Sequence, residues 1–370
     1  MEVKFSYLTR QFEKPEEILE AIRRVALRGD FTLGKEVKEF EEKFAQLAGT
    51  KYAVGVNSGT DALVFCLKAL GVGAGDEVIT VPNTFYATAA AIALVGARPV
   101  FVDVNEEYLM DAKKLERVIT PRTKAIIPVQ LTGNVCDMEE IMAFARNHNL
   151  VVVEDACQSI TASLWGKPAG SFGQANAFSL HPLKNLNVWG DGGLITTDSE
   201  ELYQKFLKLR NHGLISRDIC EFYGHNSRLH TVQAAVGLEV LKTLPEAERR
   251  RRELAAFYDR AFADIPQLKI PPRPSRKQQV FHLYILLAER RDELIKWLAS
   301  RGVEAKIHYP IPLHLQPASR YLGYKEGDFP VAEFQAQSIV SLPLHQHLTQ
   351  EEAEKVVSEV KNFYVGSSWA

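Results

Sequence analysis

Two charged side chains in the middle of the chain have the type and setting of catalytic groups. Lys184 follows the apolar stretch 176–180 and the turn residue Pro182. Partial desolvation there would lower the pKa of its amine and make it a nucleophile for aldehydes, although a surface lysine would fit the same pattern. Asp155 ends the apolar run 150–155. A carboxylate at the end of a buried strand needs a cationic partner or caps the next segment.

Two further features lie earlier in the chain. Ser58-Gly59-Thr60 begins a predicted helix after the apolar run 52–56. The free N–H groups of a helix start favour an anion, and glycine lets a ligand approach the backbone, but an ordinary N-cap has the same sequence. Phe85 follows the apolar run 77–81, so its ring could stack on a planar ligand or simply pack in the core.

Together these four features are what pyridoxal 5′-phosphate (PLP) requires. The helix start would take the phosphate, the acid would keep the ring nitrogen protonated, and the lysine would form an imine with the aldehyde. Simple nucleotide motifs do not fit. Gly71, Gly73 and Gly75 follow a helix and precede a strand, which is the wrong order for a dinucleotide fingerprint, and no GxxxxGK[ST] segment occurs.

Strand-like and helix-like stretches alternate through the first two thirds of the chain. Helices are expected at 36–48, from Ser58 onward, and at 137–147. The strand-like runs are continuously apolar, as in a sheet covered on both faces. We therefore predict an α/β fold with a mostly parallel mixed sheet flanked by helices. The predicted strands are 52–56, 77–81, 99–104, 124–129, 150–155, 176–180 and 193–197.

The last third of the chain predicts a smaller α+β domain that begins with a charged helix. This helix is expected over about 245–264, after Pro245. The arginines at 249–252 look like a nucleic-acid patch, but flanking glutamates favour a solvated helix face. We expect a large cofactor-binding domain with the N-terminal segment over 1–245 and a small C-terminal domain over 246–370.

Within the small domain, three segments suggest a β-α-β unit. They are a strand at 281–287, a helix at about 291–301 and a strand at 303–309. Thr349 and Glu352 form a predicted capping box for a final helix.

Composition narrows the class of protein further. The chain has 370 residues, with 46% apolar and 24% charged residues, which argues against disorder. Lys and Arg number 44 against 46 Asp and Glu, so there is no basic excess for nucleic acid. No apolar run is long enough to span a membrane, and residues 1–12 contain neither an apolar signal core nor a small-residue cleavage site, so a cytoplasmic protein is expected. The four cysteines are far apart without a CxxC pair, so no metal site is expected.

The order and spacing of the motifs resemble the DegT/DnrJ/EryC1/StrS family, the sugar aminotransferases of fold type I. This resemblance covers nearly the whole chain and implies an aspartate-aminotransferase-like fold. The matching segments are 31–34, 57–63, 82–85, 154–159, 178–185, 190–193, 224–228, 233–235 and 308–310.

The resemblance also implies roles for individual residues. Lys184 would bond to the cofactor and then move the proton between substrate and cofactor, and Asp155 would pair with the ring nitrogen. Phe85 would stack on the ring, and Gln158 would lie near the ring hydroxyl. The implied phosphate ligands are Ser58, Gly59, Thr60 and Ser179.

Three further roles concern the substrate and a second subunit. By resemblance, Asn226 would reach the phosphate of the neighbouring subunit, so that a homodimer with shared active sites is the expected unit. His308 and Tyr309 lie where the family contacts substrate. Arg228 would either fix the loop of Asn226 or contact a diphosphate.

The implied reaction transfers an amino group in two halves. An amino acid, expected to be glutamate, would convert PLP to pyridoxamine 5′-phosphate (PMP), which would then aminate a keto-sugar, expected to be nucleotide-linked. Two alternatives stay open: another PLP or PMP reaction such as dehydration, and a non-catalytic PLP-binding regulatory protein. A dehydratase branch of the family has histidine in place of the lysine, so Lys184 favours transamination.

Four positions depart from the usual family pattern. Gln130 stands where histidine is common, Thr132 where tyrosine is common, and Asn134 at a variable place. His230 stands where an acid is more usual. We expect these changes to alter the acceptor pocket, so the sugar, the aminated carbon and the nucleotide stay open.

Overall fold

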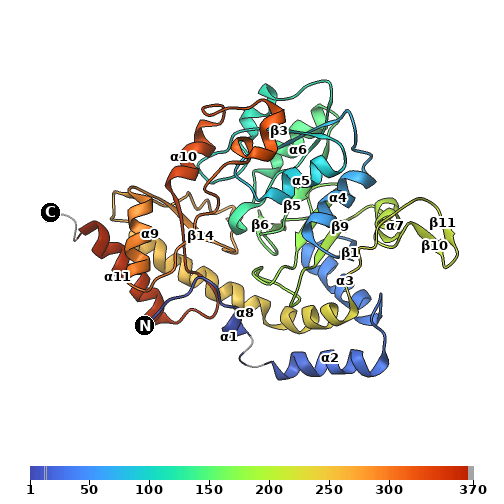
Figure 1. Ribbon diagram of the computed structural model, residues 1–370, viewed down its shortest axis with the longest axis horizontal. Coiled ribbons are helices and arrows are strands. Elements are labelled where there is room, and N and C mark those ends of the chain that lie inside the picture. Colours follow the sequence, from blue (N-terminus) through green and yellow to red (C-terminus); the bar gives the residue numbers. More distant parts are fainter. Residues whose placement is uncertain (12, 14, 366–370) are drawn as a thin grey trace.

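The structure is a computed structural model that describes residues 1–11, 13 and 15–365. Within these residues the central sheet has seven strands in the order β1-β9-β8-β5-β4-β2-β3 (Figure 1). In this sheet β9 runs antiparallel to both neighbours, and the other pairs are parallel. The predicted α/β fold with a mostly parallel mixed sheet is confirmed. The strands are β1 (Tyr52–Val56), β2 (Glu77–Thr80), β3 (Arg98–Phe101), β4 (Thr123–Ile126), β5 (Val151–Asp155), β8 (Ala175–Ser179) and β9 (Gly193–Thr197).

Helices cover both faces of the sheet, which explains why its strands are apolar on both sides. Successive residues of β1 belong to different cores: Ala53 lies in the core that contains Phe40, and Val54 in the core that contains Leu63. The expected helices at 36–48, 137–147 and after Ser58 are confirmed. The surrounding helices are α3 (Lys35–Ala48), α4 (Gly59–Ala69), α5 (Tyr86–Leu94), α6 (Met138–Asn147) and α7 (Glu200–Leu209).

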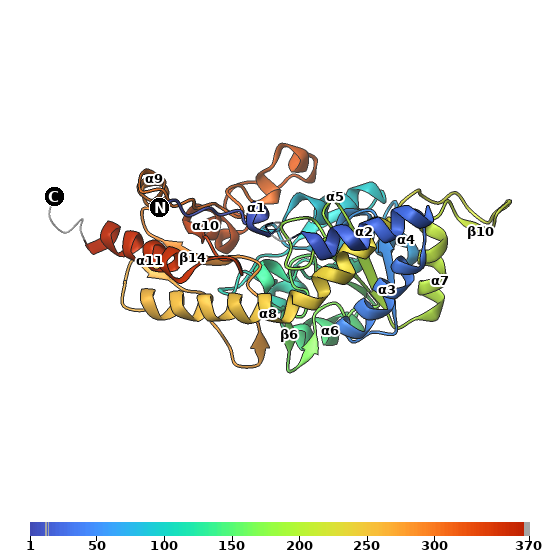
Figure 2. The ribbon, with the colours of Figure 1, turned by 90° about the horizontal axis from the view of Figure 1, so that it is seen from below.

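One long helix, α8 (Thr231–Phe262), passes from the central sheet to the C-terminal part of the chain (Figure 2). The prediction that this helix begins after Pro245 is wrong, because the helix includes the proline. A proline usually ends a helix at the preceding residue. Here Val240 and Leu254, on either side of it, are buried, and this packing holds the helix together. The position expected to separate two domains therefore lies inside one helix.

The C-terminal lobe contains a second, antiparallel sheet with the order β12-β14-β15. The expected strand at 281–287 and helix at 291–301 correspond to β14 and α9. The capping box is confirmed: the N–H of Thr349 donates to Oε2 of Glu352 (2.9 Å), and the N–H of Glu352 donates to Oγ1 of Thr349 (3.1 Å). The elements are β12 (Leu268–Lys269), β14 (Tyr284–Ala288), α9 (Arg291–Ser300), α10 (Pro330–Ser338), β15 (Ile339–Leu342) and α11 (Gln350–Val365).

The predicted strand at 303–309 is wrong, and so is the β-α-β unit. The strand that pairs with β14 is β15, which runs antiparallel to it. The segment 303–309 makes isolated bridges instead, from Val303 to Val3 and from Lys306 to Ser341. Its pairing is divided between the N-terminal segment and β15, so no continuous ladder forms.

The N-terminal segment lies against the C-terminal lobe, as both views show (Figures 1 and 2). The N–H of Val3 donates to the carbonyl of Gly302 (2.8 Å). Arg10, in the short helix α1 (Leu8–Gln11), forms an ion pair with Glu352 (2.5 Å) at the start of α11. The following helix, α2 (Glu16–Arg28), packs instead against α8. The first and last parts of the chain are therefore joined.

Short strands complete the fold. A hairpin of β10 and β11 projects from the body of the molecule (Figure 2). Among the described helices, none combines the length and apolar character that crossing a bilayer requires. The short strands are β6 (Ser163–Leu164), β7 (Lys167–Pro168), β10 (Leu214–Ser216), β11 (Ile219–Cys220) and β13 (Lys277–Gln278).

Part of the stability should be lost when Glu352 is protonated. Its hydrogen bonds from Arg10 hold the pKa of the carboxyl at about 2, below the usual 4.5. A lowered pKa stabilises the fold above the unfolded-state value, and this stabilisation disappears as pH falls from 4.5 toward 2. Glu352→Gln should lower Tm at pH 7 and flatten its acid dependence, whereas exposed Glu354→Gln should not. Equal Tm values for Glu352→Gln and wild type at pH 7 would contradict this.

Candidate active site

A cavity of about 340 Å³ lies at the carboxyl ends of β5 and β8, beside the start of α4. In open α/β sheets, ligands bind at this edge. Its lining includes residues that the sequence singled out from distant parts of the chain. These are Ser58, Gly59, Thr60, Phe85, Asp155, Gln158, Ser179, Lys184, His308 and Tyr309.

The start of α4 forms one wall of the cavity. Ser58 is the N-cap, and its Oγ accepts a hydrogen bond from the N–H of Asp61 (3.0 Å). The other N–H groups of the first turn have no partner within the helix and remain available to an anion. A Cβ on Gly59 would lie 3.0 Å from Ser179 Cβ, and one on Gly193 would lie 2.3 Å from the Ser58 carbonyl oxygen. Glycine at both positions lets the helix start pack directly on the ends of β8 and β9.

Asp155 ends β5 and is buried. Its Oδ2 accepts a hydrogen bond from the hydroxyl of Thr88 (2.7 Å), and its Oδ1 accepts one from the N–H of Cys157 (3.2 Å). Both neighbours donate to the carboxyl oxygens and fix their orientation. A carboxylate has lone pairs for further donors, so Asp155 can also accept a hydrogen bond from a protonated ring nitrogen in the cavity.

Lys184 lies in the loop between β8 and β9 and lines the same cavity. Burial lowers the pKa of its amine, while Cys157 and Asp155 act in the opposite direction. In the described part of the chain, its Nζ has neither a hydrogen bond nor an ion pair. A desolvated amine without a fixed partner is the state that nucleophilic attack on an aldehyde requires.

Gln158, His308 and Tyr309 form another wall. The amide of Gln158 accepts a hydrogen bond from the N–H of Thr132 (2.7 Å) and donates to the hydroxyl of Tyr309 (3.4 Å). Burial raises the pKa of Tyr309 to about 12 and lowers that of His308 to about 4. Nδ1 of His308 lies 2.8 Å from Oγ of Ser341. Both side chains are therefore neutral at pH 7 and can bind polar, uncharged groups.

Asn226 and Arg228 do not line this cavity within one chain. Asn226 is exposed and pairs with Asn211 through an isolated bridge. Nη1 of Arg228 donates to Oδ1 of the same Asn211 (3.0 Å). This contact agrees with the interpretation in which Arg228 fixes the loop of Asn226.

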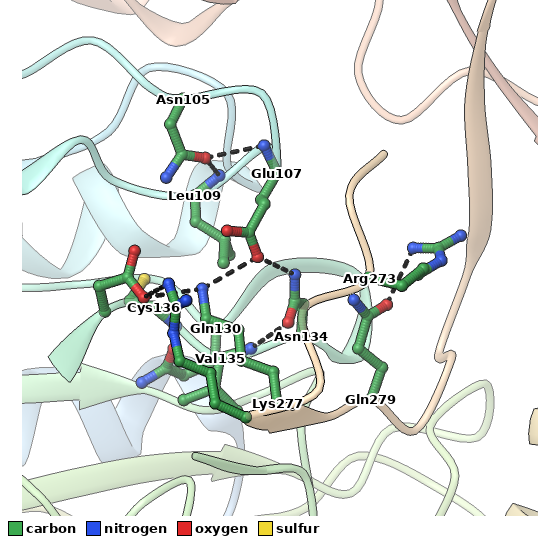
Figure 3. A network of polar contacts seen from close by, with 12 residues as sticks. Asn105, Glu107, Leu109, Gln130, Asn134, Val135, Cys136, Arg273, Lys277 and Gln279 are labelled. Carbon is green, nitrogen blue, oxygen red and sulfur yellow. Dashed lines mark hydrogen bonds and ion pairs between the residues drawn. The ribbon is translucent and has the colours of Figure 1, made fainter. Parts of the chain in front are cut away.

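The four residues that depart from the family pattern do not line this cavity. Gln130 donates to buried Glu154 (2.7 Å) and accepts from the N–H of Cys136 (2.6 Å). Asn134 donates to Glu107 (3.3 Å), in the network that Figure 3 shows. Neither side chain lines this cavity, and their effect on the acceptor pocket stays a prediction. Thr132 reaches the site through its N–H bond to Gln158, and His230 is the N-cap of α8.

Several residues of the site were not identified from the sequence. Thr88 fixes Asp155 from the first turn of α5, three residues after Phe85. His282, next to the start of β14, and Cys157 both line the cavity. Burial lowers the pKa of His282 well below 6.5, so this imidazole is neutral at pH 7. The only signal for Thr88 was its helical spacing from Phe85, and nothing local marked His282 as part of the site.

The residues present fit PLP. The helix start can take a phosphate, and the carboxylate of Asp155, which lines the same cavity, is held by two donors. The unpaired Nζ of Lys184 lines the same cavity. The exposed ring of Phe85, 49% accessible, lines it as well and is free to cover a planar group. These residues can hold the phosphate, ring and aldehyde of one cofactor.

Comparison with known proteins identifies aminotransferases that match nearly the whole chain. A model of the DegT/DnrJ/EryC1/StrS aminotransferase family matches residues 13–361. A pleiotropic regulatory protein of Geobacillus stearothermophilus is 41% identical over 98% of this chain and 99% of that protein. The dTDP-3-amino-3,4,6-trideoxy-alpha-D-glucose transaminase of Streptomyces venezuelae is 40% identical over 93% of this chain and 91% of that enzyme. The crystal structure of S. venezuelae DesV in complex with a ketimine intermediate is 40% identical, covers 98% of both chains and has a TM-score of 0.96. The chain therefore belongs to the DegT/DnrJ/EryC1/StrS aminotransferase family.

Proposed function

We propose that this enzyme transfers an amino group from an amino acid, glutamate, to a nucleotide-linked keto-sugar with PLP as cofactor. The unpaired amine of Lys184, in one cavity with the buried carboxylate of Asp155, is the observation that carries the proposal. The family assignment and the sugar-nucleotide transaminase among its relatives support the substrate class.

Each wall of the cavity has a part in this chemistry. Bound PLP supplies an electron sink for negative charge at the reacting carbon. Asp155 keeps the proton on the ring nitrogen, and the start of α4 binds the phosphate. Lys184 Nζ, whose pKa is lowered by burial, takes up the proton from the substrate carbon and returns it. The neutral side chains of His308 and Tyr309 orient the sugar.

A product assay tests this function. The enzyme is incubated with PLP, glutamate and a dTDP- or UDP-linked 3-keto-sugar, and the products are identified by mass spectrometry. We expect an amino sugar together with 2-oxoglutarate, and neither when glutamate is omitted. A dehydrated sugar without 2-oxoglutarate would favour the dehydratase alternative instead. One relative is named as a regulatory protein. The unpaired amine of Lys184 argues against a purely regulatory role here, because a protein that only binds PLP needs no such group.

We further propose that the working unit is a homodimer in which Asn226 completes the partner's site. Asn226 is exposed and outside the cavity of its own chain. The projecting hairpin beside it carries exposed apolar side chains, Ile215 (54%) and Ile219 (56%) among them, and Tyr223 is fully accessible. Such a patch is typical of an interaction surface.

Hybrid dimers test this arrangement. A Lys184→Ala subunit and an Asn226→Ala subunit, co-expressed with different tags and purified on both, should form one intact site of two. The hybrid should therefore have about half of the wild-type activity, while each variant alone is impaired. An inactive hybrid would show that Asn226 does not act across the interface.

Two coarser features belong to the same proposal. The four cysteines are unpaired, which supports a cytoplasmic location. We also keep the division into a large domain over 1–245 and a small one over 246–370, because the C-terminal lobe has its own core. His308 and Tyr309 then bring the small domain to the cofactor site.

A further inference from the structure

The N-terminal segment contacts the loop that carries the catalytic lysine. Tyr7 is 4% exposed, and its hydroxyl lies 3.2 Å from the carbonyl oxygen of Leu183 and 3.1 Å from that of Lys184. Burial raises the pKa of Tyr7, so the hydroxyl stays protonated and shares its one proton between these two carbonyls. A residue at the beginning of the chain thus holds the backbone of Lys184 itself.

A buried arginine fixes the ring of Tyr7. The guanidinium carbon of Arg251, on α8, lies 5.4 Å from the centre of the Tyr7 ring, within the range of a cation–π contact. Arg251 is 1% exposed, and within the described residues no carboxylate lies at ion-pair distance from it. The rings of His345 and His347 also lie near Tyr7, at 5.3 and 5.7 Å between centres.

Arg251 joins the separate segments that surround this ring. Its Nη1 donates to the carbonyls of Phe281 (2.9 Å) and Leu344 (3.3 Å), and its Nε donates to Oε1 of Gln346 (3.0 Å). Phe281 directly precedes His282, which lines the active-site cavity. One buried cation therefore holds α8, the segment before β14 and the segment after β15 around Tyr7.

Leu183 and Lys184 need such an anchor, because the other firm contacts of the loop lie after the lysine: Asn185 Nδ2 donates to the carbonyl of Val280 (3.0 Å), and Leu186 and Val188 are buried. The loop between β8 and β9 has no helix or strand, and the Lys184 Nζ has no partner in the described chain. Besides Tyr7, the N–H of Lys184 donates to the carbonyl of His181 (2.8 Å), which is in the same loop. A displacement of about 1 Å at a reacting group can lower a rate by about 100-fold.

We propose that Tyr7, held by Arg251, is a positioning residue for Lys184. The inference rests on the proposed function only in taking Lys184 as the catalytic lysine. Tyr7 does not line the cavity, and it acts through the backbone of the loop. The N-terminal segment then contributes to catalysis in addition to its packing against the C-terminal lobe.

The chain offers a matched control for this role. Tyr258 is also fully buried, and its hydroxyl donates to the carbonyl of Pro343 (2.9 Å) in the second core. Tyr7→Phe and Tyr258→Phe each remove one buried hydroxyl that donates to backbone carbonyls. Both should lower Tm by a similar amount, since the two hydrogen bonds are of the same kind. If the two variants then differ in kcat or in exchange of the Lys184 loop, the cause is the location of the Tyr7 hydroxyl and not a general loss of stability.

Two measurements decide the proposal. In Tyr7→Phe we expect kcat to fall about 10-fold with little change in KM, and amide hydrogen exchange in the loop 181–189 to become faster in the cofactor-free protein. Tyr258→Phe should leave kcat and this exchange unchanged. Arg251→Lys keeps the charge but cannot hold the same contacts. It should therefore lower kcat and speed amide exchange in the loop, as Tyr7→Phe does.

Wild-type kcat and wild-type exchange in Tyr7→Phe would overturn the proposal, and so would an equal loss of kcat in Tyr258→Phe. Faster exchange without any change in kcat would also overturn it, because the loop would then move without consequence for the lysine. Exchange is measured without cofactor or substrate. A failure of the proposed function would therefore show in the Lys184→Ala assay and leave the exchange result intact.

Discussion

Replacing Lys184 by alanine should lower turnover by about 10⁴-fold or more, since no other amine lines the cavity within the described chain. The variant loses both the group that bonds to the cofactor aldehyde and the group that moves the proton. It should still bind PLP through the start of α4, because these contacts do not involve the lysine. Turnover is measured as 2-oxoglutarate formed from glutamate, and cofactor binding by equilibrium dialysis.

Lys205→Ala is a suitable control for this substitution. Lys205 is an exposed lysine of α7 that pairs with Glu201 (2.7 Å), far from the cavity lining. It should have wild-type turnover and wild-type PLP affinity. Full activity in Lys184→Ala would contradict the assignment of the lysine and the mechanism built on it.

Replacing Asp155 by alanine should impair catalysis much more than folding. Without this carboxylate, the ring nitrogen of bound PLP would lose its acidic partner, and the cofactor would be a weaker electron sink. We expect kcat to fall by about 10² to 10³-fold, because the charge that develops in the transition state is less well stabilised. The loss of two hydrogen bonds from Thr88 and Cys157 should cost about 1–3 kcal/mol of stability.

Thr88→Val separates the carboxylate from its support. This variant keeps Asp155 and the shape of residue 88 but removes the 2.7 Å hydrogen bond to the carboxylate. Its kcat should lie between those of the wild type and Asp155→Ala.

The rates of Asp155→Ala and wild type are compared in single turnovers with glutamate. A wild-type rate in Asp155→Ala would contradict the role of Asp155 in the site.

Local sequence patterns predicted those parts of the molecule that local physics determines. Continuous apolar runs indicate buried parallel strands, and the residues that follow them, such as Asp155, must lie at the same edge of the sheet. Ser58 marks a helix start by its capping chemistry. These two rules identified Ser58, Gly59, Thr60 and Asp155 in the cavity lining, whereas Gln158, Ser179, His308 and Tyr309 were predicted from the family resemblance.

Contacts between distant segments were not predictable in this way. Pro245 argued for a helix start, but burial on both sides of it keeps α8 continuous. The apolar run 303–309 has the pattern of a strand, yet its partners lie in two different segments. Thr88 and Tyr7 reach Asp155 and Lys184 only through the tertiary fold, so no local pattern could identify them.

The absorbance spectrum of the purified protein, recorded before and after addition of glutamate, tests the central claim most directly. We predict a visible band from PLP bonded to Lys184, which glutamate converts to a near-ultraviolet band of PMP as 2-oxoglutarate is released. This change would establish the cofactor, the donor and the first half of the reaction together. A protein without any chromophore, even after incubation with PLP, would contradict the assignment of Lys184 and the proposed function.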